Sequence, residues 1–232
     1  MEIMFLGNSV VQQIRPYRNS REIKNYVHQF KKYSKKGYEI VNLSQAYWTI
    51  DDLKKETFLR GQRYDPDVVV INIGVNDAFT RGMPKLFWKI LNSYSNSSIL
   101  IKFRAIINKY VQYIQPFIIK CGLYTTWTNE KRFEKSYLEL VRFLKKEFSC
   151  RIIVLNIPKT TQRLERLLPY SNKKIINYNS IISKIVNEEN LQLININNFA
   201  SENENLFPEG VHYSAEMHDY VANELLQIIK SI

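Results

Sequence analysis

The stretch Val68-Val69-Val70-Ile71-Asn72-Ile73-Gly74-Val75-Asn76-Asp77 decides the fold class of this 232-residue chain. Its first six residues are almost continuously apolar and β-branched, which is typical of a strand covered on both faces. Four similar runs occur at residues 3–6, 39–43, 152–157 and 191–196. Together the five runs predict five strands buried between helices.

Helical patterns alternate with these runs. Apolar residues recur at threes and fours over residues 21–34, 50–60, 85–148, 173–188 and 215–229. Ser214 stands as an N-cap before the last of these segments. Alternating strands and helices predict an α/β fold, a three-layer α/β/α sandwich with a five-stranded parallel sheet, in a single domain over residues 1–232. Right-handed crossovers then place the loops that follow the strands at one edge, where ligand sites of such folds form.

One connection is longer than this plan requires. The third and fourth predicted strands are 78 residues apart, although a crossover needs only one helix. We interpret residues 81–128 as a helical insertion over the ligand-binding edge of the sheet. Its segment 99–119 interleaves aromatic with basic side chains: Phe103, Tyr110, Tyr113 and Phe117 with Lys102, Arg104 and Lys109. These aromatics either form a satellite core or make a lid or surface that grips an extended ligand.

Composition excludes several classes of protein. Hydrophobic residues make up 45% of the chain and charged residues 24%, which are values of a globular protein rather than a disordered one. The first residues lack the basic and apolar regions of a signal peptide, so we expect no export signal, and no apolar stretch approaches the ~18 residues of a membrane span. We therefore expect a soluble, cytoplasmic protein. Without an export signal, Cys121 and Cys150 predict no disulfide and no cysteine zinc site, and we expect both to be buried.

The charge is strongly basic, with 33 Lys and Arg against 22 Asp and Glu. Residues 81–150 alone hold 13 basic and four acidic side chains. Such an excess is either a set of solvated helix faces or a surface for an anionic partner, such as an acidic glycan, a nucleic acid or a lipid surface. No recognisable nucleic-acid-binding motif accompanies the charge, so we expect no specific nucleic-acid binding. Peripheral association of the basic insertion with a membrane surface stays open.

Two polar segments follow predicted strands at the edge where the loops gather. Gly7-Asn8-Ser9-Val10 follows the first strand and leaves the serine hydroxyl free at the entry to the next segment. Gly74-Val75-Asn76-Asp77 follows the third strand, where the Asn76 amide is a neutral N–H donor suited to an oxyanion. Taken singly, each segment has an ordinary alternative as a turn or a helix cap.

A third polar segment, Pro208-Glu209-Gly210-Val211-His212, precedes the last predicted helix. His212 is one of three histidines, and the other two lie inside predicted helices, where packing or surface roles explain them. A loop histidine is more often a bystander than a base. Here, however, a carboxylate three residues earlier supplies the orienting partner that a catalytic imidazole needs.

The three segments together make the sequence resemble the SGNH hydrolases, the GDSL-like esterase and lipase superfamily, over essentially its whole length. The family's Gly-Asp-Ser motif corresponds to Gly7-Asn8-Ser9, and its Gly-x-Asn-Asp block is matched in full by residues 74–77. Its Asp-x-x-His block corresponds to Glu209-Gly210-Val211-His212. The resemblance implies the flavodoxin-like sandwich of that family.

The sequence departs from the family at three positions. Asn8 and Glu209 stand where the family has aspartate, and Tyr47 stands where the family's second block has a glycine. The family uses the backbone N–H of that glycine to complete an oxyanion hole. A backbone N–H does not depend on the side chain, but Tyr47 must then adopt the backbone conformation that the glycine adopts.

The resemblance implies roles for these residues. Ser9 is the expected nucleophile, His212 the general base and Glu209 the carboxylate that orients the imidazole. The backbone N–H groups of Ser9 and Tyr47 and the side-chain amide of Asn76 form the expected oxyanion hole. Supporting roles fall to Gly7, Asn8, Gly74 and Asp77, the last by bracing the Asn76 and Ser9 loops. No metal and no organic cofactor is called for.

The implied function is a serine esterase that removes O-acyl groups, in our reading O-acetyl groups, from a carbohydrate or a related ester. Its partner would be an acylated small molecule or a glycan, and the basic charge favours an anionic one. Two alternatives remain from the sequence. One is an O-acyltransferase that modifies a surface polysaccharide, and the other is a non-catalytic glycan- or nucleic-acid-binding module on the same frame.

Overall fold

The apolar runs form one parallel sheet in the computed structural model of the chain, with the strand order β2-β1-β3-β4-β5. The strands are β1 (Glu2–Gly7), β2 (Glu39–Ser44), β3 (Val68–Asn72), β4 (Arg151–Leu155) and β5 (Gln192–Ile194). The structure describes residues 1–12, 25–34, 37–91, 98–200 and 203–231. All five predicted strands are therefore present, and the parallel sheet is confirmed. The predicted burial is wrong for the edge strands, because no residue of β2 and only Ile194 of β5 is buried.

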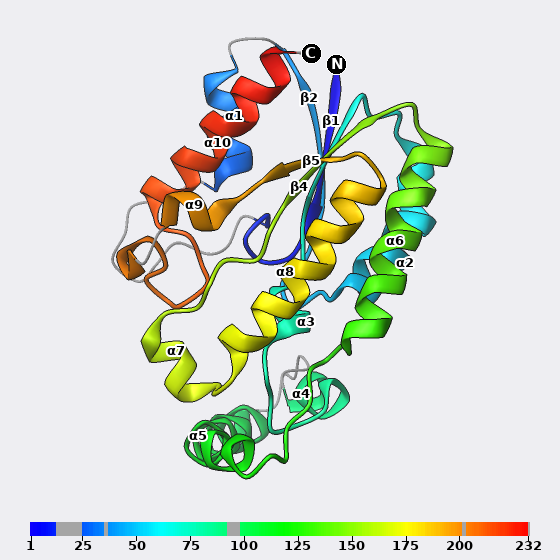
Figure 1. Cartoon of the computed structure of the whole chain (residues 1–232). Helices are drawn as coiled ribbons and strands as arrows, with labels where there is room; N and C mark the ends of the chain where they lie inside the picture. The colour runs from blue at the N-terminus through cyan, green and yellow to red at the C-terminus, as the bar shows by residue number, and fades with distance from the viewer. Residues whose placement is uncertain (13–24, 35–36, 92–97, 201–202, 232) are drawn as a thin grey trace.

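Helices cover both faces of the sheet, as Figure 1 shows. On one face lie α1 (Tyr26–Tyr33) and α10 (Ala215–Lys230), and on the other lie α2 (Ile50–Arg60), α6 (Glu130–Glu147) and α8 (Ser171–Glu188). Along β1, Ile3 and Phe5 pack on the first face and Met4 and Leu6 on the second, all of them fully buried. Full burial of such a side chain stabilises the fold by roughly 1.5–3 kcal/mol. The predicted three-layer sandwich is confirmed.

Several boundaries differ from the sequence-based ones. The helix predicted over 21–34 begins at Tyr26 after an Asn25 N-cap, and residues 21–24 lie outside the described part. The fifth strand is shorter than predicted, because Ile196 already begins a helix. The structure adds short elements that the sequence did not predict: α3 (Val75–Ala78), α7 (Gln162–Leu167), α9 (Ile196–Ala200), η1 (Gly61–Arg63) and η2 (Glu204–Leu206).

The long connection between β3 and β4 supplies α4 (Lys85–Leu91) and α5 (Ser98–Lys120) before it reaches α6. Both helices lie beyond the carboxyl ends of the strands, at the bottom of Figure 1. Arg81 and Thr125 pair their backbones in antiparallel fashion, with N···O distances of 2.8 and 2.9 Å. This pair closes the base of the segment that we treat as the insertion.

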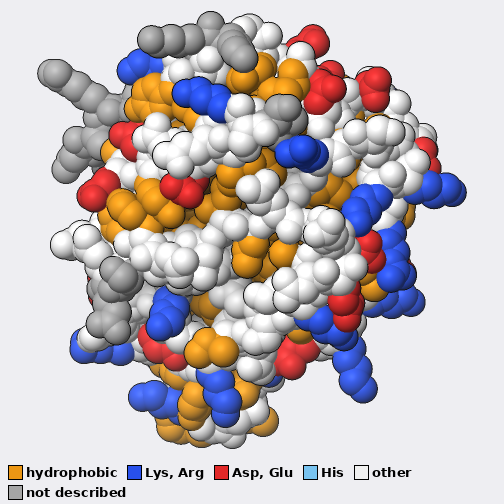
Figure 2. Space-filling model, turned by 45° about the horizontal axis from the view of Figure 1, so that its top comes forward, with side chains coloured by type: hydrophobic (Ala, Val, Ile, Leu, Met, Phe, Trp, Pro, Cys, Tyr) orange, Lys and Arg blue, Asp and Glu red, His pale blue; other side chains and the backbone are white. Residues whose placement is uncertain are grey.

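The aromatic side chains of α5 point to solvent rather than into a core. Tyr110 is 64% exposed, Tyr113 74% and Phe117 70%. The satellite-core interpretation is therefore wrong for these three residues, whereas the side chains of Phe103 and Arg104 lie outside the described part. In Figure 2, hydrophobic and basic side chains adjoin at the lower end of the molecule.

Two further expectations concern the surface. No helix in the described ranges is long and apolar enough to cross a membrane. The predicted burial of the cysteines is wrong for Cys121, which is exposed just after α5. Cys150 is half-buried, and burial raises the pKa of its thiol to about 11.

Candidate active site

Ser9 lies in a tight turn that begins where β1 ends. The backbone N–H groups of Val11 and Gln12 both donate to the carbonyl of Asn8, and the Asn8 side chain accepts from the N–H of Val10. Gly7 is required because a Cβ there would lie 2.5 Å from the carbonyl oxygen of Asn72 in β3. The turn therefore lifts the Ser9 hydroxyl above the carboxyl edge of the sheet.

His212 lies in the loop between η2 and α10. This loop folds back at Gly210, which has a φ of +95° and whose added Cβ would lie 2.8 Å from Leu164. The loop is fixed on both sides, since Gly210 donates to the carbonyl of Phe207 and Ser214 donates to that of Leu206. Ser214 then caps α10 by accepting from the N–H of Met217, as the sequence predicts.

The structure brings the predicted serine, histidine and carboxylate into one hydrogen-bonded chain. Ser9 Oγ lies 3.1 Å from His212 Nε2, and His212 Nδ1 lies 2.8 Å from Glu209 Oε2. A carboxylate can only accept, so Nδ1 carries a proton that it donates to Glu209. In the neutral imidazole, Nε2 is then free to accept the proton of the serine hydroxyl.

The carboxylate end of this chain is open to water. Glu209 has 49% of its side chain exposed and His212 34%. The Glu209 side chain is one methylene longer than the aspartate of the family motif, and its carboxylate reaches the imidazole all the same. Because a solvated carboxylate interacts more weakly with a nearby charge than a buried one does, Glu209 would stabilise a positive charge on His212 less than a buried carboxylate would.

Asn76 lies in α3, the short helix after β3, and its side chain is buried. Its Nδ2 donates to the carbonyl of Trp48 at 3.1 Å, which uses one of two amide hydrogens and leaves the other for a ligand. Gly74 turns the chain from the strand into α3 with a φ of +121°, and a Cβ there would lie 2.7 Å from Ile157 Cδ1. Glycine is therefore needed at this position both for the conformation and for the space.

Tyr47 takes up the left-handed backbone conformation, with a φ of +65°. Few non-glycine residues adopt it, so the segment has the backbone expected of a glycine even though a tyrosine is present. The Trp48 carbonyl accepts from Asn76, which ties this segment to α3. The Tyr47 ring itself is 54% exposed and makes an edge contact with Trp88 of α4.

Asp77 is fully buried and accepts from the backbone N–H of Ile50, at 3.1 and 3.2 Å from its two oxygens. It therefore ties α3, which carries Asn76, to the start of α2 and to the segment that carries Tyr47. We expected it to brace both the Asn76 and the Ser9 loops, but its hydrogen bonds among the described residues do not reach the Ser9 loop. Burial raises the pKa of the Asp77 carboxyl to about 7, against the opposing effect of the Ile50 hydrogen bond.

A second layer of polar side chains holds the histidine loop on the sheet. The Asn72 amide contacts the hydroxyls of Tyr26 and Tyr213 at 3.4 Å each. His218 is buried, and its Nδ1 accepts from the Tyr26 N–H at 3.1 Å, so this histidine has the packing role that the sequence predicts. Burial lowers the pKa of His218 to about 4, with His212 adding to the effect. Sequence reasoning missed this network, because its members are spread over three distant segments.

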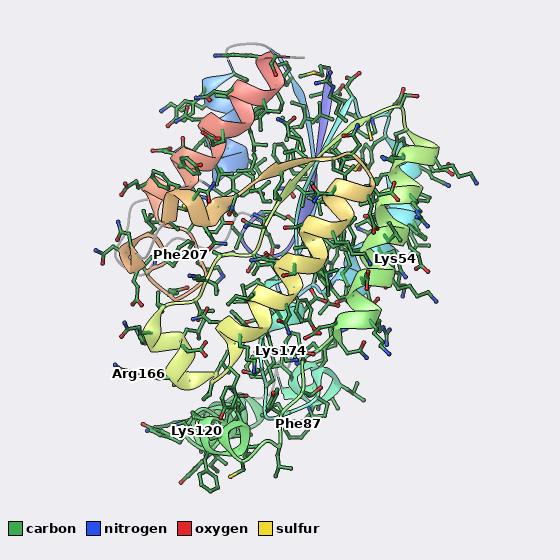
Figure 3. All side chains as sticks on the ribbon, viewed as in Figure 1. Lys54, Phe87, Lys120, Arg166, Lys174 and Phe207 are labelled. Carbon is green, nitrogen blue, oxygen red and sulfur yellow. The ribbon has the colours of Figure 1, made fainter. Side chains whose placement is uncertain are left out.

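Hollows of two sizes, one very small and three larger, lie near the hydrogen-bonded chain of Ser9, His212 and Glu209. A cavity of only about 10 Å³ is lined by neighbours of the proposed site residues, among them Val10, Val75 and Val211. A cavity of about 280 Å³ is lined by Glu209 and α7, and one of about 740 Å³ continues along α7 to Lys109 and Tyr113 of α5. A further one of about 630 Å³ lies between α7 and the loop before α10, near the labelled Arg166 and Phe207 of Figure 3.

The described residues contain no group of three or more His, Cys, Asp or Glu side chains placed to hold a metal ion.

Residues 5–220 match the family model of the GDSL-like lipase/acylhydrolase family. The chain belongs to this family. Its members are esterases and acylhydrolases, so the chain is an enzyme of the SGNH hydrolase type. No individually curated protein sequence matches the chain.

Solved structures share the fold. The acetyl xylan esterase AlAXEase is 19% identical, with a TM-score of 0.65 over 99% of this chain and 100% of that one. Axe2, an acetylxylan esterase from Geobacillus stearothermophilus, is 18% identical, with a TM-score of 0.63 over 97% and 92%. A lipase/acylhydrolase from Enterococcus faecalis is 14% identical, with a TM-score of 0.65 over 99% and 95%. At these identities the likeness shows the fold alone.

Proposed function

We propose that this protein is a serine O-acetyl esterase that acts on a carbohydrate through an acyl-serine intermediate. The observation that carries the proposal is the hydrogen-bonded chain from Ser9 Oγ through His212 to Glu209. Two solved variants of Axe2, in which a histidine and a serine are replaced, are described as catalytic mutants, which supports the same pair of roles here.

The geometry supports a two-step reaction. As His212 Nε2 takes the proton, Ser9 Oγ bonds to the ester carbonyl carbon. The carbon–oxygen bond to the sugar then breaks, and His212 returns the proton to the leaving sugar oxygen. Water attacks the acyl-serine in the same way, giving acetate and free Ser9. The oxyanion of each step would be held by the Asn76 amide and the backbone N–H groups of Ser9 and Tyr47.

Structures that share the fold support a short acyl group. AlAXEase and Axe2 are both described as acetyl xylan esterases. An acetyl group has only one carbon beyond the carbonyl, so it needs no long apolar channel beside the serine.

The surroundings of the site support a large alcohol part such as a glycan. The cavities along α7 begin at Glu209 and reach α5, whose side chains Lys109 and Tyr113 line the far end. Exposed aromatic rings stack on sugar rings, and cationic side chains suit acidic sugars. The insertion would thus hold the polymer while the sheet edge carries the chemistry.

A second candidate, O-acetyl transfer to a polysaccharide, uses the same acyl-serine with a sugar hydroxyl in place of water. The cavity that α5 lines is the observation that favours it, because an acceptor seated there would exclude water. Incubation of an acetyl donor with a polysaccharide acceptor decides between them. Acetylated glycan supports transfer, and free acetate alone supports hydrolysis.

The Ser9→Ala variant tests the proposal. We expect it to fold as the wild type does and to lose turnover of p-nitrophenyl acetate by at least about 10³-fold, because no other group replaces the nucleophile. A fluorophosphonate should label the wild type at Ser9 and leave the variant unlabelled. Ser180→Ala, an exposed serine on α8, is the matched control and should keep both activity and labelling. Wild-type activity in the Ser9→Ala variant would exclude this mechanism.

A further inference from the structure

Arg81 begins the insertion and lies among aromatic rings next to the proposed oxyanion segment. Its guanidinium carbon is 3.9 Å from the centroid of the Trp127 ring and 5.6 Å from that of Phe79. The Trp127 ring is 6.5 Å from that of Trp88, which in turn is 6.3 Å from that of Tyr47. The rings thus connect the arginine to the residue whose N–H we assign to the oxyanion hole.

This arginine has no acidic partner in the part of the chain that the structure describes. None of the ion pairs between described residues includes it, although the chain forms such pairs at many other lysines and arginines. The Nε of Arg81 and the Nε1 of Trp127 are both buried, and neither has an acceptor among the described residues. Buried donors without acceptors are rare and costly, which points to an acceptor that arrives from outside the chain.

Arg81 is charged at neutral pH despite its burial. Burial lowers the pKa of its guanidinium to about 10, which is still well above 7, and the nearby Tyr47 phenol acts in the opposite direction. The Trp127 ring covers one face of the guanidinium and the Nε is buried, but Arg81 as a whole is only half-buried, so the edge with the two Nη groups is the one that a ligand can reach. A carboxylate matches this edge because its two oxygens accept two parallel hydrogen bonds.

The position of Arg81 in the fold restricts which molecule can supply this carboxylate. The backbone pair between Arg81 and Thr125 holds Arg81 and the nearby Trp127 at the base of the insertion. Arg81 follows α3, which carries Asn76, by only a few residues, and the proposed oxyanion residue Tyr47 lies against the same ring cluster. A molecule held here would therefore reach the ester-binding edge of the sheet as well.

We infer that Arg81 and Trp127 form a subsite for a carboxylate of the substrate, so that the acetylated sugar is an acidic one of the uronic-acid kind. This inference rests on the proposed function and narrows it to one class of glycan. It also distinguishes Arg81 from the rest of the basic charge of the insertion. Most of the other described lysines and arginines there lie exposed on α4 and α5, whereas Arg81 is held in place by Trp127.

The test uses two substrates that differ only at the carboxyl group: a mono-O-acetylated methyl glucuronide with a free carboxylate, and the same sugar as its carboxyl methyl ester. Acetate release gives kcat/KM for each. We expect the wild type to prefer the acid by about 10–100-fold, the range of a charge-assisted bidentate hydrogen bond. The Arg81→Gln variant should lower this acid-to-ester ratio by the same factor.

Two further variants make the result specific. Arg63→Gln removes an exposed arginine that precedes β3, at the opposite edge of the sheet, and should leave the ratio as in the wild type. Arg81→Lys keeps the charge but lacks the planar guanidinium with its paired donors, so it should give an intermediate acid-to-ester ratio. This variant also replaces Arg81→Gln in the test if Arg81→Gln does not fold. Circular dichroism and thermal unfolding check each variant.

The outcomes separate the two proposals. Equal rates for acid and ester in the wild type, or a ratio unchanged by Arg81→Gln, would overturn the subsite and leave the esterase intact. If neither sugar releases acetate and fluorophosphonate does not label Ser9, the proposed function fails, and the subsite fails with it.

Discussion

Two helices that follow each other in the chain, α5 and α6, differ in the burial of their aromatic residues. In α6, Phe133 and Tyr137 are fully buried against the sheet, together with three aliphatic side chains of the same face. In α5, Tyr113 and Phe117 are at least 70% exposed. The sequence patterns are alike, but α6 leads back to β4 and packs on α2 and α8, whereas α5 lies beyond the ends of the strands.

This difference separates two tasks within the chain. The frame of sheet and packed helices fixes the Ser9, Asn76 and His212 segments, so its aromatic residues contribute to stability. The insertion has no sheet face to cover, so its exposed aromatic residues are available to a ligand. Substitutions in the frame should therefore change stability or turnover strongly, and those on the exposed face of α5 should leave stability nearly unchanged.

The largest expected effect is on stability. Phe133→Ala removes a ring that contacts those of Tyr137 and Tyr178, at centroid distances of 5.5 and 4.8 Å. We expect the free energy of unfolding to fall by about 3–5 kcal/mol. Phe117→Ala is the matched variant on α5 and should cost less than about 0.5 kcal/mol. Urea unfolding measures both, and equal losses would show that α5 is packed like α6.

The next effect is on turnover. Asn76→Ala removes the proposed side-chain donor to the oxyanion and should lower kcat for p-nitrophenyl acetate by about 10²–10³-fold. Asn177→Ala, an exposed asparagine on α8, should keep the wild-type kcat. If Asn76→Ala lowers the unfolding free energy but not kcat, the amide only holds the Trp48 carbonyl.

A smaller loss should follow the change Glu209→Gln. The glutamine can still accept from His212 Nδ1 but carries no charge to stabilise the imidazolium. Because the carboxylate is half exposed, we expect kcat to fall by about 10–100-fold, less than for a buried carboxylate. Glu216→Gln, in the first turn of α10, removes a nearby charge that does not contact His212 and provides the control. Undiminished kcat in Glu209→Gln would mean that the carboxylate only orients the ring.

The smallest effect is a pH dependence of stability. With its pKa raised from 3.8 to about 7, folded Asp77 holds a proton that the unfolded chain releases. Its contribution to the unfolding free energy is therefore complete below about pH 4 and declines as the pH rises towards 7. Between pH 6 and 7 the wild type should lose about 1 kcal/mol relative to Asp77→Asn. A constant difference between the two proteins over this range would contradict the raised pKa.

Much of the frame was predictable from sequence because local pattern and burial coincide there. Continuous β-branched runs favour strands, and all five runs became strands, although only β1, β3 and β4 are buried on both faces. The site segments were predictable for a related reason. In a parallel sheet the loops after the strands share one edge, and Ser9 and Asn76 follow two neighbouring strands. Short elements such as α7 and α9 were not predicted, because a helix of five or six residues is too short to show a clear helical periodicity of apolar residues.

The sequence alone determined the order of strands and helices along the chain, the polar residues at the carboxyl edge of the sheet and the excess of basic charge. Each of these depends on residue type and local spacing. Only the tertiary structure decided that Tyr47 adopts a glycine-like backbone, that Asp77 holds α2 and that Arg81 lies on Trp127 without an acidic partner among the described residues. Such features arise where segments far apart in the chain meet, and no local pattern encodes which side chain will lie opposite which.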